Sequence, residues 1–335
     1  MTMTTSLRAA VAGGGSWGTA LSHILAAAGH ETTLVLRDEQ VARAVNERHE
    51  NPRYLPGRPL HRGVTATTDP HALQRCDVLV LAVPCQHQRS WLQSMKTLIS
   101  ANTVVVNASK GLENGTCLPM SRVLAEELPH LAARYAVLSG PSFAADVMDG
   151  QPTAVVLGCE DEKLGSRLRA LFSTPFFRCY SSTDVTGVEM GGALKNVMAI
   201  AAGVCTGLGF RANASAALVT RGLAELSRIG VAMGAKPLTF MGLSGLGDLV
   251  LTCMGGLSRN RQVGERLGRG EKLEDIVASL GMVAEGVKTA GAARMLASRF
   301  QLSAPVTEAV CRILHEGASP ATAVRELMER PLKEE

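Results

Sequence analysis

A glycine-rich turn near the start of the chain constrains the fold more than any other feature of the sequence. The short apolar run Ala9–Ala12 leads into Gly13-Gly14-Gly15-Ser16-Trp17-Gly18, which has the spacing G-x-G-x-x-G. A helical stretch over 19–28 follows, and residues 32–37 have the composition of a second buried strand. A strand, a glycine turn, a helix and a strand in this order predict a dinucleotide-binding βαβ unit.

Each glycine of the turn has a separate expected role. Gly13 permits the tight turn, Gly15 lets the pyrophosphate approach the backbone, and Gly18 lets the helix and the strand pack closely. The pyrophosphate would lie on the N-terminus of the helix, where amide donors are unpaired. A glycine-rich turn that arose by chance is the alternative, and the surrounding strand and helix patterns argue against it.

The end of the second strand bears on the type of dinucleotide. NAD-specific folds place an Asp or Glu there for the ribose 2′-hydroxyl, whereas this chain has Arg37 followed by Asp38. A cation at this position can pair with the 2′-phosphate of NADP or stack on the adenine. We therefore expect NADP(H) to be accepted, with NAD(H) left open, because Asp38 could take the acidic role after a shift of one residue.

Later apolar runs predict a mostly parallel, doubly wound α/β sheet, since helical stretches separate several of them. Such sheets bind ligands beyond the carboxyl ends of their strands, and Lys110, Ser142 and Pro84 follow three of those ends. The predicted strands are 77–84, 103–108, 135–138, 153–157 and, at the edge of the sheet, 176–180.

The strand pattern stops after about residue 182, and Ala-, Leu- and Gly-rich helical stretches fill the rest of the chain. We expect an α/β dinucleotide-binding domain over 1–183 and an all-α substrate-binding domain over 184–335. The predicted helices are 187–206, 213–234, 260–268, 271–279, 287–298 and 305–315.

The first of these helices carries a lysine on a small, apolar face. At 3.6 residues per turn, Lys195 shares this face with Gly191, Gly192, Met198 and Ala202. A lysine that extends its ammonium to water is the structural alternative. The position of the helix at the predicted domain junction favours a functional lysine, with the two glycines admitting substrate and nicotinamide beside it.

Two predicted loops of the second half carry polar groups. In the loop 242–253, Asp248 is the lone acid among glycines and apolar residues, either as a helix N-cap or as a carboxylate near Lys195. In the loop 255–261, Ser258 can cap the following helix, and the free amides together with Arg259 make an anion site.

Composition excludes several classes of function. Aromatic residues make up 4% of the chain and the net charge is +4, which is too little for a nucleic-acid footprint. The eight cysteines are scattered, without a C-x-x-C pair or a nearby histidine cluster, which argues against a metal site and fits reduced thiols in a cytoplasmic protein. We find neither an apolar signal core nor an uncharged run that would span a bilayer.

Taken together, the motifs resemble one family over nearly the whole chain: the bacterial-type NAD(P)-dependent glycerol-3-phosphate dehydrogenases. The resemblance implies a Rossmann half, a helical half, and the reduction of dihydroxyacetone phosphate to sn-glycerol 3-phosphate for glycerophospholipid synthesis. It leaves a homodimer open. The stretches that carry it are GGGSWGTAL at 13–21, NASKGLE at 107–113, SGPSFA at 139–144, GGALKNVMAIAAG at 191–203, NASAALVTRGLAE at 213–225, GLGDLVLTC at 245–253 and SRNR at 258–261.

The resemblance also implies roles for individual residues. Lys195 corresponds to the general acid/base, with Lys110, Asp248 and Thr252 around the reacting oxygen. The implied substrate-binding residues are Lys110, Gly140, Ser142, Lys195, Asp248, Ser258, Arg259 and Asn260. The implied cofactor-binding residues are Gly13, Gly15, Ser16, Trp17, Gly18, Arg37, Lys110, Ala144, Arg259, Val283 and Glu285.

Chemistry gives Lys195 a definite task, because a ketone that becomes an alcohol needs a proton on oxygen besides a hydride on carbon. Burial and Lys110 should lower the pKa of Lys195, and Asp248 should oppose them. Two rival hypotheses are a β-hydroxyacid dehydrogenase of the 6-phosphogluconate type and a dinucleotide sensor without turnover. The GLGDL and SRNR motifs disfavour the first, and the intact lysine and anion loop disfavour the second.

Overall fold

The structure is a computed structural model that describes residues 6–280 and 284–331. It contains two compact units. The sheet unit comprises Met1–Ser109 and Met120–Val188, and the helical unit comprises Lys110–Pro119 and Glu189–Glu335. The ten residues that follow Ser109 therefore belong with the helical unit, although they lie inside the N-terminal half of the sequence.

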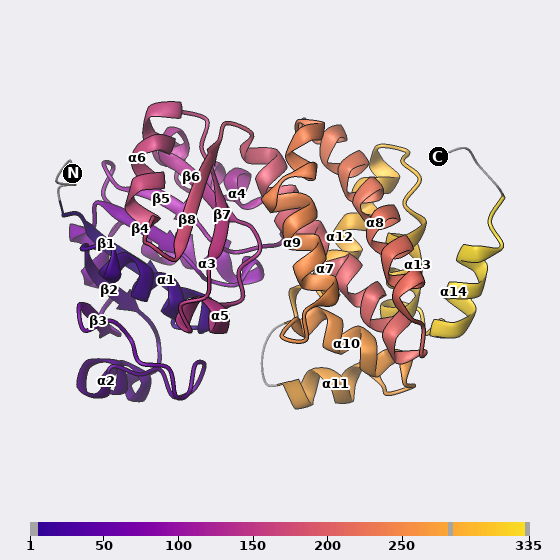
Figure 1. Cartoon of the computed structure of the whole chain (residues 1–335). Coiled ribbons are helices and arrows are strands. Elements are labelled where there is room, and N and C mark those ends of the chain that lie inside the picture. Colours follow the sequence, from indigo (N-terminus) through magenta and orange to yellow (C-terminus); the bar gives the residue numbers. More distant parts are fainter. Residues whose placement is uncertain (1–5, 281–283, 332–335) are drawn as a thin grey trace. The chain divides into compact units, whose positions relative to one another are not determined.

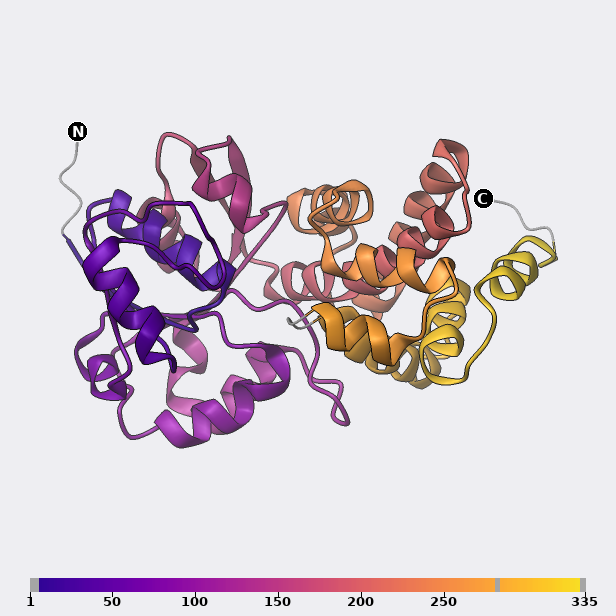
Figure 2. The ribbon, with the colours of Figure 1, turned by 90° about the horizontal axis from the view of Figure 1, so that it is seen from below.

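The sheet unit is built on eight strands in the order β3-β2-β1-β4-β5-β6-β7-β8, with helices on its faces (Figures 1 and 2). All neighbouring pairs are parallel except β6 and β7, so the predicted doubly wound, mostly parallel sheet is confirmed. The strands are β1 (Arg8–Ala12), β2 (Glu31–Val35), β3 (Val64–Thr67), β4 (Val78–Leu81), β5 (Val104–Asn107), β6 (Tyr135–Ser139), β7 (Thr153–Gly158) and β8 (Phe177–Ser182).

The apolar runs form the central strands because both faces of the sheet are covered. Four of the five residues of β1 and all four of β4 are buried. The strand β3 was not predicted, since only two of its four residues are buried and the run is too short to give a pattern. The helices are α1 (Ser16–Ala27), α2 (Glu39–Arg48), α3 (Cys85–Met95), α4 (Met120–Glu127), α5 (Ala144–Met148) and α6 (Glu162–Phe172), with short 3₁₀ turns η1 (Pro70–Arg75) and η2 (Pro129–Arg134).

The helical unit is organised around α7 (Val185–Gly207). This helix is long and apolar enough to cross a membrane, but its apolar stretch is wholly buried inside the protein, as expected of a core helix. The other helices are α8 (Ala212–Ala232), η3 (Pro237–Met241), η4 (Leu243–Gly247), α9 (Asp248–Met254), α10 (Arg259–Gly268), α11 (Leu273–Leu280), α12 (Glu285–Arg299), α13 (Pro305–His315) and α14 (Pro320–Met328).

The prediction of a loop over 242–253 was wrong. This segment is a π-helical turn, η4, that continues into α9. Its glycines serve close packing: a Cβ at Gly245 would collide with the backbone of Phe240. The buried Leu249 and Cys253, four residues apart, then anchor α9 in the core of the helical unit. The C-terminal helix α14 was not predicted either.

Candidate active site

The glycine turn has the geometry that a dinucleotide needs. Gly13 has a φ of +117°, and a Cβ at Gly18 would collide with the carbonyl of Gly13. A Cβ at Gly15 would meet open space, and α1 begins there without a side-chain cap, which suits a pyrophosphate at the N-terminus of the helix. The buried indole Nε1 of Trp17 also lacks a hydrogen-bond partner among the described residues.

The remaining predicted residues of the sheet unit follow the carboxyl ends of two strands. Arg37 is exposed beyond β2, and Asp38 caps α2. Beyond β6, Gly140 has a φ of +137°, and the hydroxyl of Ser142 donates to its carbonyl at 3.0 Å. Ala144 begins α5, which packs against α1, the helix of the glycine turn.

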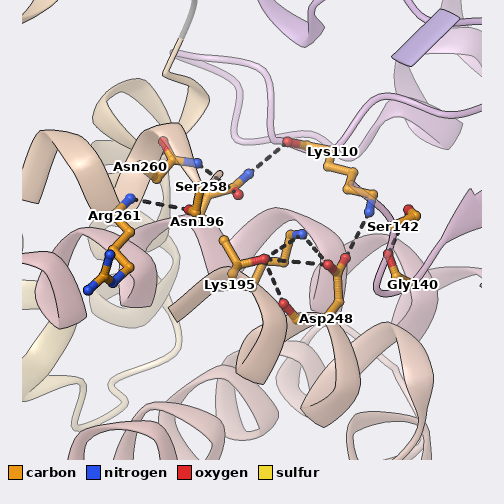
Figure 3. A network of polar contacts seen from close by, with 10 residues as sticks. Lys110, Gly140, Ser142, Lys195, Asn196, Asp248, Ser258, Asn260 and Arg261 are labelled. Carbon is orange, nitrogen blue, oxygen red and sulfur yellow. Dashed lines mark hydrogen bonds and ion pairs between the residues drawn. The ribbon is translucent and has the colours of Figure 1, made fainter. Parts of the chain in front are cut away.

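The helical unit brings two lysines together on one carboxylate (Figure 3). Lys195 of α7 donates from Nζ to Asp248 Oδ1 and, at 2.9 Å, to the hydroxyl of Thr252. Lys110 donates from Nζ to Asp248 Oδ2 at 2.8 Å. The Thr252 hydroxyl donates its own proton to the carbonyl of Asp248 at 2.6 Å, so it can only accept from Lys195. The spacing of Asp248 and Thr252 places both on the α9 face that meets α7.

Burial lowers the pKa of Lys195 to about 8; Asp248 opposes this shift and Lys110 adds to it. The directions match those expected from the sequence. The side chain of Lys195 is 8% exposed and that of Asp248 is 1% exposed, so the low polarity around them strengthens each of these effects. An ammonium has three N–H donors, and Lys195 directs two of them to Asp248 and Thr252. It thus retains one donor for a ligand and, with a pKa of about 8, can exchange a proton around that pH.

Beside this cluster runs a chain of amides that the sequence did not reveal. Asn196 donates from Nδ2 to the backbone carbonyl of Lys110 at 3.2 Å, and its Oδ1 accepts from Asn260 at 3.0 Å. Asn260 Oδ1 then accepts from the backbone N–H of Gly286 at 3.0 Å. The chain ties the Lys110 loop to the N-termini of α10 and α12. The only signal in the sequence was that Asn196 is the neighbour of Lys195 on a mostly apolar helix.

The predicted anion loop is a helix N-terminus. Ser258 caps α10 by accepting from the N–H of Arg261 at 3.2 Å, as expected, and Arg259 is the first residue of the helix. Arg259 is half-buried, while Asn260 is buried through the amide chain. Glu285 begins α12, next to Gly286, and is thereby held near Asn260. Val283 lies outside the described residues.

One expectation about the lysine helix needs correction. The space beside Gly191 is filled by protein, since a Cβ there would collide with the carbonyl of Ser244 in η4. Gly191 therefore admits the segment that carries Asp248, and not a substrate or nicotinamide. Glycine does allow a close approach at this position, as expected, but the group that approaches is the protein's own backbone in η4.

The Rossmann-type sheet has an intact glycine turn, and burial lowers the pKa of Lys195 to about 8. Together these features define a dinucleotide-dependent oxidoreductase of the dehydrogenase class. Two family descriptions match the chain: the N-terminus of NAD-dependent glycerol-3-phosphate dehydrogenase over residues 8–165, and its C-terminus over 184–325. The chain belongs to the NAD-dependent glycerol-3-phosphate dehydrogenase family.

Individual relatives of the chain carry the name of the same enzyme family. The chain is 61% identical over 333 residues to a glycerol-3-phosphate dehydrogenase [NAD(P)+] of Desulfovibrio desulfuricans, covering 99% of this chain and 100% of that one. It is 57% identical over 330 residues to the protein of the same name from Nitratidesulfovibrio vulgaris, covering 98% and 100%. The crystal structure of glycerol-3-phosphate dehydrogenase from Coxiella burnetii superimposes with a TM-score of 0.92 at 37% identity, covering 97% and 99%.

Proposed function

We propose that the chain catalyses the reversible, NAD(P)H-dependent reduction of dihydroxyacetone phosphate to sn-glycerol 3-phosphate, which supplies glycerophospholipid synthesis. The observation that carries this proposal is the buried Lys195, held by Asp248 and Thr252 in a chain that belongs to this family. When bound, the reduced nicotinamide supplies the hydride.

In this proposal the protein supplies the proton. The Lys195 ammonium donates its third N–H to the carbonyl oxygen of the substrate and releases that proton as the carbon is reduced. In the opposite direction the neutral amine accepts the proton of the alcohol. Asp248 holds the ammonium in place from one side, and Thr252 fixes its rotation by accepting the second N–H. Lys110, bound to the other oxygen of Asp248, favours proton release from Lys195.

The phosphate end of the substrate is assigned to α10. Ser258 caps this helix, and in the proposal the N-terminus of α10 and the guanidinium of Arg259 are the anion-binding groups. Asn260 completes this set in the proposal, and Gly140 and Ser142 contribute from the carboxyl end of β6. We assign residues 1–183 to dinucleotide binding and 184–335 to substrate binding, with the Lys110–Pro119 segment serving the second task.

A substrate panel tests the proposal. We expect dihydroxyacetone phosphate to cause loss of reduced-nicotinamide absorbance, and dihydroxyacetone without its phosphate to be a very poor substrate. Turnover of 6-phosphogluconate with NADP⁺ instead would favour the β-hydroxyacid alternative. Binding of nicotinamide nucleotides with no turnover of any of these compounds would favour a sensor.

We further propose a cytoplasmic location. All eight cysteines are buried and no disulfide joins them, which fits a reducing compartment. The homodimer stays a prediction, to be checked by analytical ultracentrifugation.

A further inference from the structure

We propose that Arg53 joins Arg37 in binding the 2′-phosphate of NADP(H), and that this pair makes the enzyme prefer NADPH to NADH. The inference rests on the proposed function only in taking the glycine turn as a dinucleotide site. It concerns residues of the sheet unit alone.

The acid that could bind a ribose 2′-hydroxyl is already committed to other partners. Asp38 Oδ1 accepts the backbone N–H groups of Gln40 at 3.0 Å and Val41 at 3.2 Å, which caps α2. Its other oxygen accepts from Arg53 Nη1 at 2.9 Å. A carboxylate held in this way points along its own helix, so the shift that would let Asp38 replace an NAD-type acid is disfavoured.

Arg53 is fixed beside the glycine turn. The fully buried Asn51 donates from Nδ2 to the Gly14 carbonyl at 2.9 Å and to the Thr19 hydroxyl at 2.8 Å. Its Oδ1 accepts from the N–H of Tyr54 at 3.2 Å, which closes a turn around Arg53. The guanidinium of Arg53 also lies 5.4 Å from the centre of the Tyr54 ring. The loop thus returns to the first βαβ unit and presents a cation at the end of β2.

Both arginines have guanidinium N–H groups that could donate to a phosphate. A guanidinium has five N–H groups, and Arg53 uses Nη1 on Asp38 while its side chain stays 60% exposed. Arg37 is exposed and makes no hydrogen bond or ion pair among residues 6–280 and 284–331. Beyond the end of β2, the two guanidinium groups of Arg37 and Arg53 therefore outnumber the single carboxylate of Asp38. Glu39 and Arg43 of α2 carry one charge of each sign and do not change this balance. This local excess of positive charge suits a phosphate and gains nothing from a hydroxyl.

The first test is nucleotide binding without turnover. We would titrate Arg53→Met and Arg37→Met with adenosine 2′,5′-bisphosphate and with adenosine 5′-monophosphate by calorimetry. Loss of one charge-assisted contact should weaken binding of the bisphosphate by about tenfold or more and leave the monophosphate unchanged. Arg48→Met is the matched control, because Arg48 is the last residue of the ten-residue helix α2, about 15 Å from the end that Asp38 caps.

The second test uses a substitution that should strengthen binding of the bisphosphate. Asp38→Asn keeps a good N-cap but removes the negative charge, so the bisphosphate should bind several-fold more tightly. If Arg53→Met fails to fold, as judged by circular dichroism, the Asp38→Asn variant alone tests the proposed 2′-phosphate site. Unchanged bisphosphate binding in Arg53→Met, equal weakening of both nucleotides, or weaker NADH binding in Asp38→Asn would overturn the inference. None of these readouts involves dihydroxyacetone phosphate, so an absence of turnover would contradict the proposed function and leave them intact.

Discussion

The chemistry of the site depends on how a few charged residues share a buried space. Lys195 and Lys110 bind opposite oxygens of Asp248, so the cluster holds two cations and one anion in surroundings that disfavour charge. Burial disfavours the charged form of Lys195 and is the main cause of its lowered pKa; Asp248 opposes this effect, and the ammonium of Lys110 adds to it.

This arrangement predicts opposite pH profiles for the two directions. Reduction needs the ammonium form of Lys195, so kcat/KM for dihydroxyacetone phosphate should fall as the pH rises through about 8. Oxidation of glycerol 3-phosphate needs the neutral amine, so its kcat/KM should rise through the same value. Steady-state rates over a pH series check both profiles, and parallel profiles in the two directions would contradict the assignment.

Arg259 should act on binding more than on the chemical step. We expect Arg259→Ala to raise KM for dihydroxyacetone phosphate strongly, because a guanidinium–phosphate contact grips the end of the substrate that does not react. The rate with phosphate-free dihydroxyacetone should change little in the same variant. An unchanged KM for the phosphorylated ketone would remove Arg259 from the phosphate site.

At the scale of elements, contacts between helices place these residues. The turn η4 passes over Gly191 of α7 and leads directly into α9, so this glycine permits the close approach of the segment that carries Asp248. A second contact joins α8 to α13. Buried Glu225 accepts the N–H groups of Val306 at 2.7 Å and Thr307 at 3.0 Å, and so caps α13 from a neighbouring helix.

Gly191→Ala tests the first contact. The added methyl group would push η4 and α9 away from α7, so we expect kcat to fall at least tenfold and the melting temperature to drop. Gly291→Ala is the matched control, because a Cβ at that helical position meets nothing within 4 Å. Gly291→Ala should leave the free energy of unfolding unchanged or raise it by up to about 1 kcal/mol. Wild-type kcat in Gly191→Ala would show that α9 does not need this approach.

Glu225→Ala tests the second contact. It leaves two buried amides of α13 without an acceptor, which should lower the free energy of unfolding by about 1–3 kcal/mol. Chemical denaturation followed by far-UV circular dichroism measures the change. Because Glu225 lies outside the proposed site, the KM of the folded enzyme should stay near the wild-type value. A raised KM without a loss of stability would point to a different role.

At the scale of the whole molecule, the sequence predicted what depends on local pattern. Buried parallel strands are continuous apolar runs, and a glycine turn in a strand–helix context has one common fold, so β1, α1 and the sheet class could be foreseen. The sequence could not show that Asn196 and Asn260 bond to each other, because their meeting depends on how α7 and α10 pack. Glycines misled the prediction over 242–253, since the same residues that favour loops also permit close helix packing.

The role of Lys195 as the proton donor is tested most directly by kcat for reduction of dihydroxyacetone phosphate by Lys195→Ala, measured beside the wild-type enzyme and with nucleotide binding verified. General acid–base catalysis contributes about 10²–10⁴-fold, so we expect kcat to fall by at least this factor while NAD(P)H still binds. A Lys195→Ala enzyme that reduces dihydroxyacetone phosphate at a near-normal kcat would contradict this role.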